Sequence, residues 1–414
     1  MIYFAYDALR RGAQPLVRML NAGTGLARSP SNPLRDTYTM RTLGTVWEMQ
    51  ARALKDYPKQ DYVVWEDVGD LEIVVDKRVE ASLPFADLLN FCMDDGAAKP
   101  KVLIAAALSG HHATLLQDTV RGFVQDFDTY ITDWKDMSVV SPDAGDFTFD
   151  VYVAHLISFL EKLGPGTHLV ATCQAAPPAM VAAAVIAQRR PDLVPASLTL
   201  MGGPVDTRVS PIWINKFAEK IPLRLLQKTN IHTMPAGHKG SGRKVYPGFM
   251  QLAGFMLLNP KPHFRQHWSF LKNGIAGDDE ALQRFRDFYD EYFAVLDMDG
   301  KFYLETLKKV FMEHHIPNGI MTYEGELVDF AAVQDMALLT VEGANDNFCP
   351  PGQTEAAHDV FTGVPAAMRK NHVQEGVGHY GVFSGSKFQN NIYPVIRDFV
   401  HAHDAHALRV PEDA

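Results

Sequence analysis

The sequence predicts an α/β fold with a mostly parallel central sheet, flanking helices and one long insertion. Short apolar runs alternate with helical segments between residues 62 and 201, which is typical of a parallel sheet. These runs lack polar alternation, as expected for strands buried on both faces. The insertion is predicted because residues 202–336 separate two strand candidates, far more than the roughly dozen residues that a crossover needs.

The elements are assigned in chain order from apolar periodicity and turn residues. Helices are expected around Leu9–Leu20 and over Leu43–Lys55, with a loop over Asn21–Asp36, where Gly, Ser and Pro are frequent. The expected strands are Tyr62–Trp65, Leu71–Val75, Val102–Leu108, Tyr130–Trp134, His168–Thr172, Ser197–Met201, Ala337–Val341 and His372–Gln374. The expected core helices are Val120–Phe127, Tyr152–Leu163, Met180–Arg189 and Ile392–His403.

The insertion divides the chain into three parts. An N-terminal helical extension (1–60) precedes a core formed by residues 61–203 and 330–414, and residues 204–329 form a mainly helical cap after the sixth predicted strand. Aromatic residues of the cap recur on one helical face, at Phe285, Phe288, Tyr289, Tyr292 and Phe293. They fit either contact with an apolar substrate or ordinary cap core.

Composition limits the classes of function. The chain has 414 residues, 47% of them hydrophobic, so a sizeable core is expected, and its formal charge of -10 argues against a nucleic-acid partner. Three cysteines are too few for a disulfide framework and favour a reducing compartment. We see no signal peptide and no apolar run long enough to span a membrane. The expected location is the cytoplasm.

A nucleophile candidate lies in the segment THLVATCQAAPPAMVAAAVIA, which begins at Thr167. An apolar strand runs directly into Cys173, and an Ala-rich helix follows. A nucleophile on a sharp strand-to-helix turn needs small neighbours two residues away on each side, and here these are Ala171 and Ala175. The helix N-terminus also favours a thiolate. The alternative is a buried structural cysteine, which is as probable from this segment alone.

Two later segments supply an acid and a histidine. Asp346 lies in a turn after the apolar run that ends in Val341, and His379 lies between glycines in GVGHYG. Taken alone, Asp346 fits an Asx-turn residue better than a catalytic one. The chain order nucleophile, acid, histidine is nevertheless that of α/β-hydrolases, and each residue follows a predicted strand. We therefore expect a Cys173, Asp346 and His379 triad.

The loop LSGHH, after the strand that ends at Leu108, is the expected second part of the site. The equivalent loop in α/β-hydrolases supplies an oxyanion-hole N–H, which indicates Gly110 and His111, and the residue after the nucleophile, Gln174, supplies another. Metal binding by the adjacent pair His111 and His112 is discounted, because no Cys or carboxylate partner lies at ligand spacing. No metal and no cofactor are expected. These parts together imply acyl transfer through a covalent acyl-enzyme.

Several segments resemble the intracellular poly(3-hydroxybutyrate) depolymerases. They are LSGHHATLL from Leu108, YITDW from Tyr130, HLVATCQ from His168, LMGGPVD from Leu200, VEGANDNFCPPGQT from Val341 and GVGHYGVFSG from Gly376. The resemblance extends to YDALRR near the N-terminus and HWSF in the cap, and so covers most of the chain. It is specific, since a cysteine in this position is uncommon among hydrolases.

The resemblance implies hydrolysis of stored polyhydroxyalkanoate to 3-hydroxybutyrate oligomers and monomer, in the cytoplasm, on or near polymer granules. It also implies the triad at Cys173, Asp346 and His379. The residues matched to substrate binding are Ser109, His112, Trp268 and Tyr380. The expected partner is the polymer or its granule surface, without nucleic acid or a membrane span, and a homo-oligomer remains compatible with the sequence.

Three alternatives stay open. A polyhydroxyalkanoate synthase-like acyltransferase shares the fold and the triad. In that family the strand-to-helix turn that carries the cysteine keeps glycines where this chain has Ala171, Ala175 and Ala176, and this chain is short for that family. A non-catalytic granule-binding protein would not need an intact triad. A general thioesterase or lipase is excluded only by the resemblance.

Overall fold

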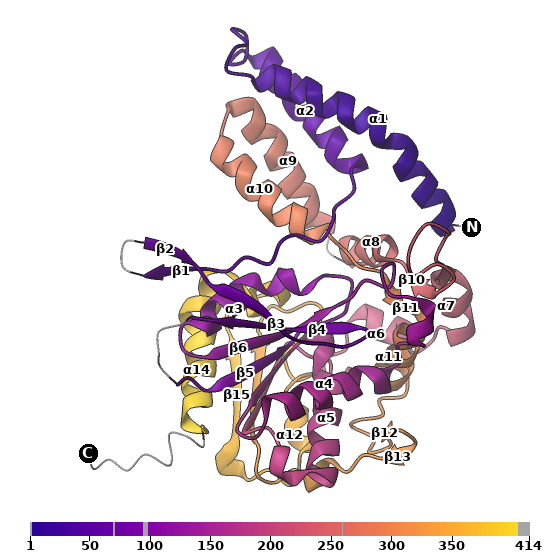
Figure 1. Cartoon of the computed structure of the whole chain (residues 1–414), viewed down its shortest axis with the longest axis vertical. Coiled ribbons are helices and arrows are strands. Elements are labelled where there is room, and N and C mark those ends of the chain that lie inside the picture. Colours follow the sequence, from indigo (N-terminus) through magenta and orange to yellow (C-terminus); the bar gives the residue numbers. More distant parts are fainter. Residues whose placement is uncertain (1, 69–70, 94–97, 259, 405–414) are drawn as a thin grey trace.

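The computed structural model describes residues 2–68, 71–93, 98–258 and 260–404, and an eight-stranded sheet lies at its centre (Figure 1). Its strand order is β15-β14-β8-β7-β5-β6-β4-β3. All neighbours from β15 to β6 pair in parallel, whereas β4 pairs antiparallel with both β6 and β3. This is the α/β-hydrolase fold, as the sequence predicts.

The central strands are short and apolar. The sheet contains β3 (Asp76–Ser82), β4 (Ala86–Cys92), β5 (Lys101–Ala105), β6 (Asp128–Trp134), β7 (His168–Thr172), β8 (Ser197–Met201), β14 (Ala337–Gly343) and β15 (Arg369–Gln374). Every residue of β7, β8 and β14 is buried, which explains why these strands could be recognised from uninterrupted apolar runs. Their carboxyl ends therefore meet at one edge of the sheet.

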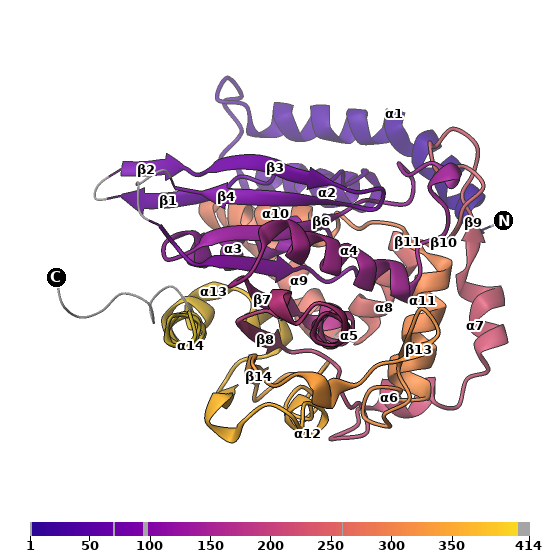
Figure 2. The same cartoon turned by 60° about the horizontal axis from the view of Figure 1, so that its bottom comes forward.

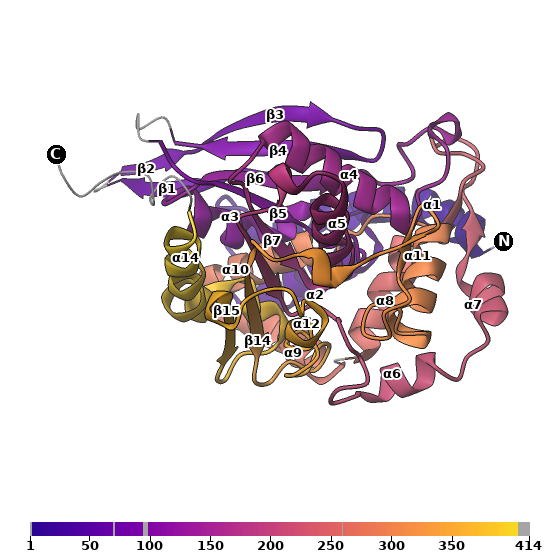
Figure 3. The same ribbon diagram turned by 90° about the horizontal axis from the view of Figure 1, so that it is seen from below.

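Helices cover both faces of the sheet (Figures 2 and 3). The core helices are α3 (Gln117–Val124), α4 (Phe149–Leu163), α5 (Ala176–Arg189), α12 (Ala357–Val360), α13 (Gly385–Lys387) and α14 (Tyr393–Ala402). In α5 every residue from Ala176 to Ile186 is buried. Its alanines leave room for close packing against α4 and the sheet, since small side chains let two elements approach each other.

Two long helices form an N-terminal hairpin that projects from the body of the molecule (Figure 1). These are α1 (Ile2–Arg28) and α2 (Tyr38–Leu54), so the loop expected from Asn21 begins only after Arg28. Gly23, in the segment predicted as a loop, and Gly44, in α2, both lie where the two helices approach closely. A Cβ at Gly23 would lie 2.9 Å from the ring of Trp47, and one at Gly44 would lie 3.2 Å from the Cβ of Ala27.

The first strand predictions were partly wrong. Tyr62 and Val64 are buried in irregular backbone, and the hairpin of β1 (Trp65–Val68) and β2 (Leu71–Val74) lies outside the central sheet. The sequence DKRVEAS of β3 was not recognised as a strand because it is an edge strand with six of its seven residues exposed. Together β3 and β4 provide the two sheet strands that the sequence did not reveal.

The residues between β8 and β14 form mainly helices above the sheet (Figure 1). These are α6 (Trp213–Ala218), α7 (Leu223–Asn230), α8 (Gly248–Leu258), α9 (Pro260–Ala276), α10 (Asp279–Tyr292) and α11 (Gly300–Thr306). Short strands accompany them: β9 (His232–Thr233), β10 (Lys244–Tyr246), β11 (Met298–Asp299), β12 (Thr322–Tyr323) and β13 (Glu326–Leu327).

Most aromatics of the cap stripe are packed inside the cap. Phe270, Phe285, Tyr289 and Tyr292 form a buried cluster between α9 and α10, whereas Phe288 is largely exposed. Ordinary cap core is therefore the role of most of them. Within the part of the chain that the structure describes, no helix is both long and apolar enough to cross a membrane.

Candidate active site

Cys173 sits at a strained strand-to-helix turn. It follows β7 directly, and a short 3-10 turn (Cys173–Ala175) leads into α5. Its φ angle is 49°, in the left-handed region that residues other than glycine rarely occupy. Such strain is kept only where the surrounding structure imposes it, and it is the geometry of a nucleophile elbow.

Close packing around the elbow explains its small residues. Ala171 and Ala175 are fully buried. A Cβ added to Gly203, which follows β8, would lie 2.2 Å from the Cβ of Ala176 and 3.1 Å from the carbonyl oxygen of Cys173. A side chain at Gly203 would therefore push the elbow out of place.

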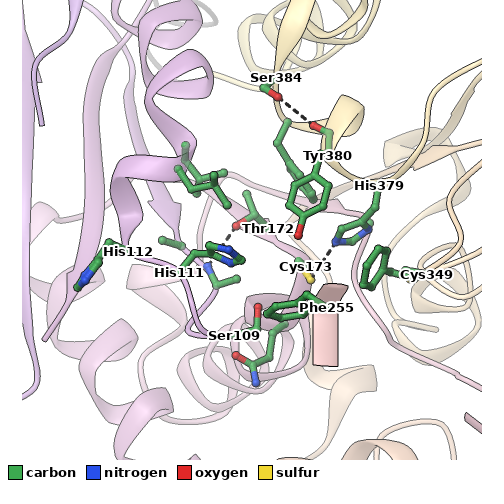
Figure 4. Close-up of a pocket in the computed structure, with 18 of the residues that line it drawn as sticks. Ser109, His111, His112, Thr172, Cys173, Phe255, Cys349, His379, Tyr380 and Ser384 are labelled. Atoms are coloured by element: carbon green, nitrogen blue, oxygen red, sulfur yellow. Dashed lines mark hydrogen bonds between the residues drawn. The ribbon is translucent and has the colours of Figure 1, made fainter. Parts of the chain in front are cut away.

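A hydrogen-bonded chain joins Cys173 to the histidine and the acid. His379 Nε2 lies 3.3 Å from Cys173 Sγ (Figure 4). His379 Nδ1 lies 2.7 Å from Asp346 Oδ2. Asp346 Oδ1 accepts the backbone N–H groups of Phe348 at 2.8 Å and Cys349 at 2.9 Å, which fixes the carboxylate. The structure thus brings together three residues that are far apart in the sequence, in the order of hydrogen bonds that a nucleophile, a base and an orienting acid require.

The loops that carry the acid and the histidine are anchored beneath the site. Glu342 is buried at the end of β14, and its carboxylate accepts backbone N–H groups from Gly352, Thr354 and Glu355. Burial raises the pKa of Glu342, although the three donors oppose that rise. Glu342 was missed in the sequence, where a charged residue inside an apolar strand was the available signal.

His379 carries the positive charge that acyl transfer by a thiol requires of the neighbouring imidazole. Burial lowers its pKa, but the charges of Cys173 and Asp346 and their hydrogen bonds outweigh burial and raise the pKa to about 10. The proton therefore stays on the imidazole at neutral pH, where the imidazolium faces the sulfur atom. A protonated imidazole in this position can give its proton to a leaving group.

A cavity of about 590 Å³ lies above the sulfur atom. Its walls are mostly apolar and come from the core and the cap, with Leu116, Phe255, Phe288, Leu307, Phe311, Phe348 and Phe383 among them. In Figure 4 the rings of His379 and Tyr380 point toward Cys173 from one side, and Ser109 lies on the other. An apolar ester could thus lie across the sulfur atom, close to both the histidine and the oxyanion loop.

Of the other predicted site residues, some line this cavity and others do not. Ser109, His111, His112, Gln174 and Tyr380 all line the cavity. The Gly110 N–H donates to the carbonyl oxygen of Leu108 at 2.9 Å, so the prediction of Gly110 as an oxyanion donor was wrong. The backbone donor roles of Gln174 and His111 stay predictions.

Trp268 lies apart from the other predicted substrate residues, and its role in substrate binding stays a prediction. It is half-exposed on α9, beside Lys272, and lines none of the cavities that reach the triad. The side of α9 that faces the site carries Gln266, Ser269 and Asn273, at spacings of three and four residues. Trp268 lies on a different side of this helix.

The two histidines of the oxyanion loop are neutral and structural in character. Burial lowers the pKa of His111 to about 4, and burial with the nearby Lys59 lowers that of His112 to about 3. His111 Nε2 lies 3.2 Å from the carbonyl oxygen of Tyr292, and Leu296 N–H donates to Gly110 O at 2.8 Å, so the loop is tied to the cap. Among the described residues no group of three or more His, Cys, Asp or Glu could hold a metal ion.

Gly202 is a further site residue that sequence reasoning missed. Its φ is 54°, and a Cβ there would lie 3.5 Å from Asp346 Oδ2 and 3.6 Å from His379 Cε1. A glycine pair directly after a buried strand was the available signal. The cap residues of the cavity, such as Phe255 and Leu307, carried no local signal, because tertiary folding alone brings them to the sulfur atom.

Comparisons with known proteins agree with this geometry. Residues 202–404 match the family model described as PHB de-polymerase C-terminus. This segment includes the cap, Asp346 and His379. No curated protein sequence matches the chain.

Solved structures of other hydrolases are similar only at low identity. A monoglyceride lipase of Saccharomyces cerevisiae is 10% identical over 84% of this chain and 97% of its own, with a TM-score of 0.45. A monoacylglycerol lipase of Paleococcus ferrophilus is 15% identical over 74% and 96%, with a TM-score of 0.42. A thermophilic esterase of Thermogutta terrifontis is 14% identical over 84% and 100%, with a TM-score of 0.41.

TM-scores this low carry no weight of their own, so the assignment depends on the family match together with the sheet topology. The matched segment spans the whole region from the end of β8 to α14, in which the sequence also shows its resemblance. The chain is a carboxylic ester hydrolase with the α/β-hydrolase sheet topology, and its residues 202–404 belong to the PHB depolymerase family.

Proposed function

We propose that this enzyme hydrolyses the ester bonds of stored poly(3-hydroxybutyrate) or a related polyhydroxyalkanoate, with Cys173 as the nucleophile. The observation that carries the proposal is the hydrogen-bonded chain from Sγ through His379 to Asp346, on a strained elbow, in a member of this family. The products are 3-hydroxybutyrate oligomers and monomer.

The reaction follows from the positions of these groups. Cys173 Sγ attacks the ester carbonyl, and a thioester bond forms while the ester C–O bond breaks. His379 Nε2 gives its proton to the departing alcohol oxygen, and Asp346 keeps the imidazole in position. A water molecule then attacks the thioester, His379 takes its proton, and the thiolate leaves. Backbone N–H groups, for which we propose Gln174 and His111, hold the oxyanion in both steps.

The cavity suits a polyester better than a sugar or nucleotide. Most of its surface is apolar, with Leu and Phe side chains prominent, although polar residues also line it. Ester carbonyls accept hydrogen bonds but donate none, so an otherwise apolar chain needs only such local donors.

We place the enzyme in the cytoplasm, on or near polymer granules. All three cysteines, Cys92, Cys173 and Cys349, are free. A nucleophilic thiol stays active in a reducing compartment, where oxidation is reversed. Family membership supports the polymer as partner.

Hydrolysis of amorphous poly(3-hydroxybutyrate) tests the proposal directly. We expect Cys173→Ala to lose hydrolysis by at least about 10³-fold, because no nucleophile remains. Cys173→Ser should keep measurable activity and release the same products. Cys92→Ala is the matched control, since Cys92 lies on β4 outside the cavity, and it should behave as wild type.

Two outcomes would contradict this function. One is a Cys173→Ala variant that still degrades the polymer at the wild-type rate. The other is release of CoA and growth of polymer from 3-hydroxybutyryl-CoA, which would make the protein an acyltransferase. Product analysis by chromatography distinguishes these results from hydrolysis.

A further inference from the structure

A second cavity reaches the triad from the side of the histidine. It has a volume of about 740 Å³ and lies between α9 and α10 and the loops that carry Asn347 and Gly378. It shares Phe288, Phe348, His379 and Tyr380 with the first cavity, but not Cys173. We call it the α9–α10 groove. Its outer residues, such as Gln266 and Arg284, are exposed, so the groove runs from solvent to His379.

The two cavities differ in charge. The lining of the first includes Asp118, Asp287 and Glu291 and no lysine or arginine. The lining of the α9–α10 groove includes Arg284, which is ion-paired with the exposed Glu280 one turn earlier on α10, and no aspartate or glutamate. An anionic group is therefore favoured in the groove over the first cavity, and there it competes with Glu280 for Arg284.

The groove also offers a row of hydrogen-bond donors. Gln266, Ser269 and Asn273 follow one side of α9 over about 10 Å, given the 1.5 Å rise per residue of a helix. Among the described residues, none of these three side chains has a hydrogen-bond partner in the protein. Such donors match the repeated carbonyl acceptors of a polyester chain.

The chemistry of ester cleavage decides which part of the chain lies in each cavity. The acyl part stays bonded to Cys173 Sγ, and the alcohol part receives the proton of His379 Nε2 and leaves. In a poly(3-hydroxyalkanoate) the acyl part runs toward the hydroxyl end, and the alcohol part runs toward the carboxylate end. The departing part is thus beside the histidine and ends in an anion.

We propose that the α9–α10 groove binds the departing, carboxylate-ended part of the polymer, while the first cavity binds the acyl part. The groove is then both the binding site for this half of the substrate and the exit for the product. This inference rests on the proposed function, and it explains why the cap places polar residues on the side of α9 that faces the site.

A bulky side chain in the groove provides the first test. Ser269→Trp should fill the groove, and Arg265→Trp, at an exposed position of α9 outside both cavities, is its control. The substrates are the linear 3-hydroxybutyrate trimer and methyl 3-hydroxybutyrate, whose leaving methanol needs no groove. We expect Ser269→Trp to raise KM for the trimer about tenfold and to leave the methyl ester within about twofold. The control should leave both unchanged.

A charge change provides the second test and does not depend on steric blockage. Arg284→Gln should raise KM for the trimer acid about threefold, the size expected for one exposed charge pair. It should leave KM for the methyl ester of the same trimer unchanged, because that molecule has no terminal anion. Arg284 is exposed, so the fold should tolerate the change.

The proposal is overturned if Ser269→Trp leaves KM for the trimer unchanged. It is also overturned if Ser269→Trp impairs both substrates equally while Arg284→Gln fails to separate the acid from its methyl ester. Failure of the proposed function looks different. In that case the wild-type enzyme cleaves neither substrate, or Cys173→Ala cleaves both.

Discussion

The charge of His379 depends on its two neighbours. Burial alone would lower its pKa, and the net rise to about 10 comes first from Cys173 and then from Asp346. A group with a raised pKa keeps its proton below that value, so the imidazolium persists through neutral pH and is lost only as the pH passes about 10. The charge of one residue is thus set by two others that come from different loops.

This dependence is measurable by NMR titration of the histidine ring. We expect His379 to titrate near pH 10 in the wild-type enzyme and at a much lower pH in Cys173→Ala, because the largest contribution that raises the pKa is then absent. The chain has 16 histidines, so His379→Gln is needed to identify the signal. A wild-type signal that titrates near 6.5 would contradict this description of the site.

Individual residues also show where sequence reasoning reached its limit. Cys173, Asp346 and His379 could be proposed from the sequence, since each follows a strand of the parallel sheet, and the strands before Cys173 and Asp346 are fully buried. A hydrogen bond within a turn engages the N–H of Gly110, and the rotation of α9 places Trp268 outside the cavities. Neither is visible in the local sequence.

Among the elements, the buried strands were predicted best. The bounds of β7 and β8 agree with the apolar runs, because a strand that is buried on both faces appears in the sequence as an uninterrupted apolar run. The edge strand β3 and the continuation of α1 through its glycines were missed. In both cases the sequence resembles a loop, and the element exists because a neighbour packs against it.

The contact between α2 and α9 is the strongest case of such packing. A Cβ at Gly274 would lie 2.2 Å from Thr45 Oγ1, whereas a Cβ at Gly254, in α8, would meet no atom within 4 Å. We expect Gly274→Ala to destabilise the protein by about 1–3 kcal/mol through overpacking. Gly254→Ala should be neutral or stabilise it by up to about 1 kcal/mol, since alanine favours a helix.

Thermal unfolding of the two variants measures this difference. The comparison is fair because both are glycine to alanine changes within cap helices, and only the space around the new Cβ differs. Equal effects of the two substitutions would show that α2 and α9 are not in close contact. A lower melting temperature of Gly274→Ala alone would show that the N-terminal hairpin is held by the cap.

For the molecule as a whole, one buried carboxyl joins the N-terminal helix, the cap and the core. Tyr3 of α1 donates its hydroxyl hydrogen to Asp297 Oδ2 at 2.5 Å, and Asp297 Oδ1 accepts the N–H of Gly248 in α8 at 2.8 Å. The backbone carbonyl of Asp297 accepts the N–H of Met137 from the core at 3.1 Å. The three parts that the sequence distinguishes therefore meet at a single residue.

The protonation of Asp297 should make the stability of the whole protein depend on pH. Burial, together with the charge of Asp136, raises its pKa from 3.8 to about 7, while its hydrogen bonds from Tyr3 and Gly248 oppose the rise. A carboxyl group with a raised pKa favours the folded state when it is protonated. This contribution is complete below the unfolded value near 3.8 and is lost as the pH rises to about 7.

Asp297→Asn separates this contribution from all others, because the amide has the same shape and no charge. Its Oδ1 can still accept the N–H of Gly248, and its amide can donate to the hydroxyl oxygen of Tyr3. We expect the free energy of unfolding of the wild-type protein to fall, relative to the variant, by on the order of 3 kcal/mol between pH 4 and pH 7. Chemical denaturation at a series of pH values measures it. Parallel curves of unfolding free energy against pH for the two proteins would mean that Asp297 is ionised in the folded state throughout this range. A group other than the protonated Asp297 would then join the three parts.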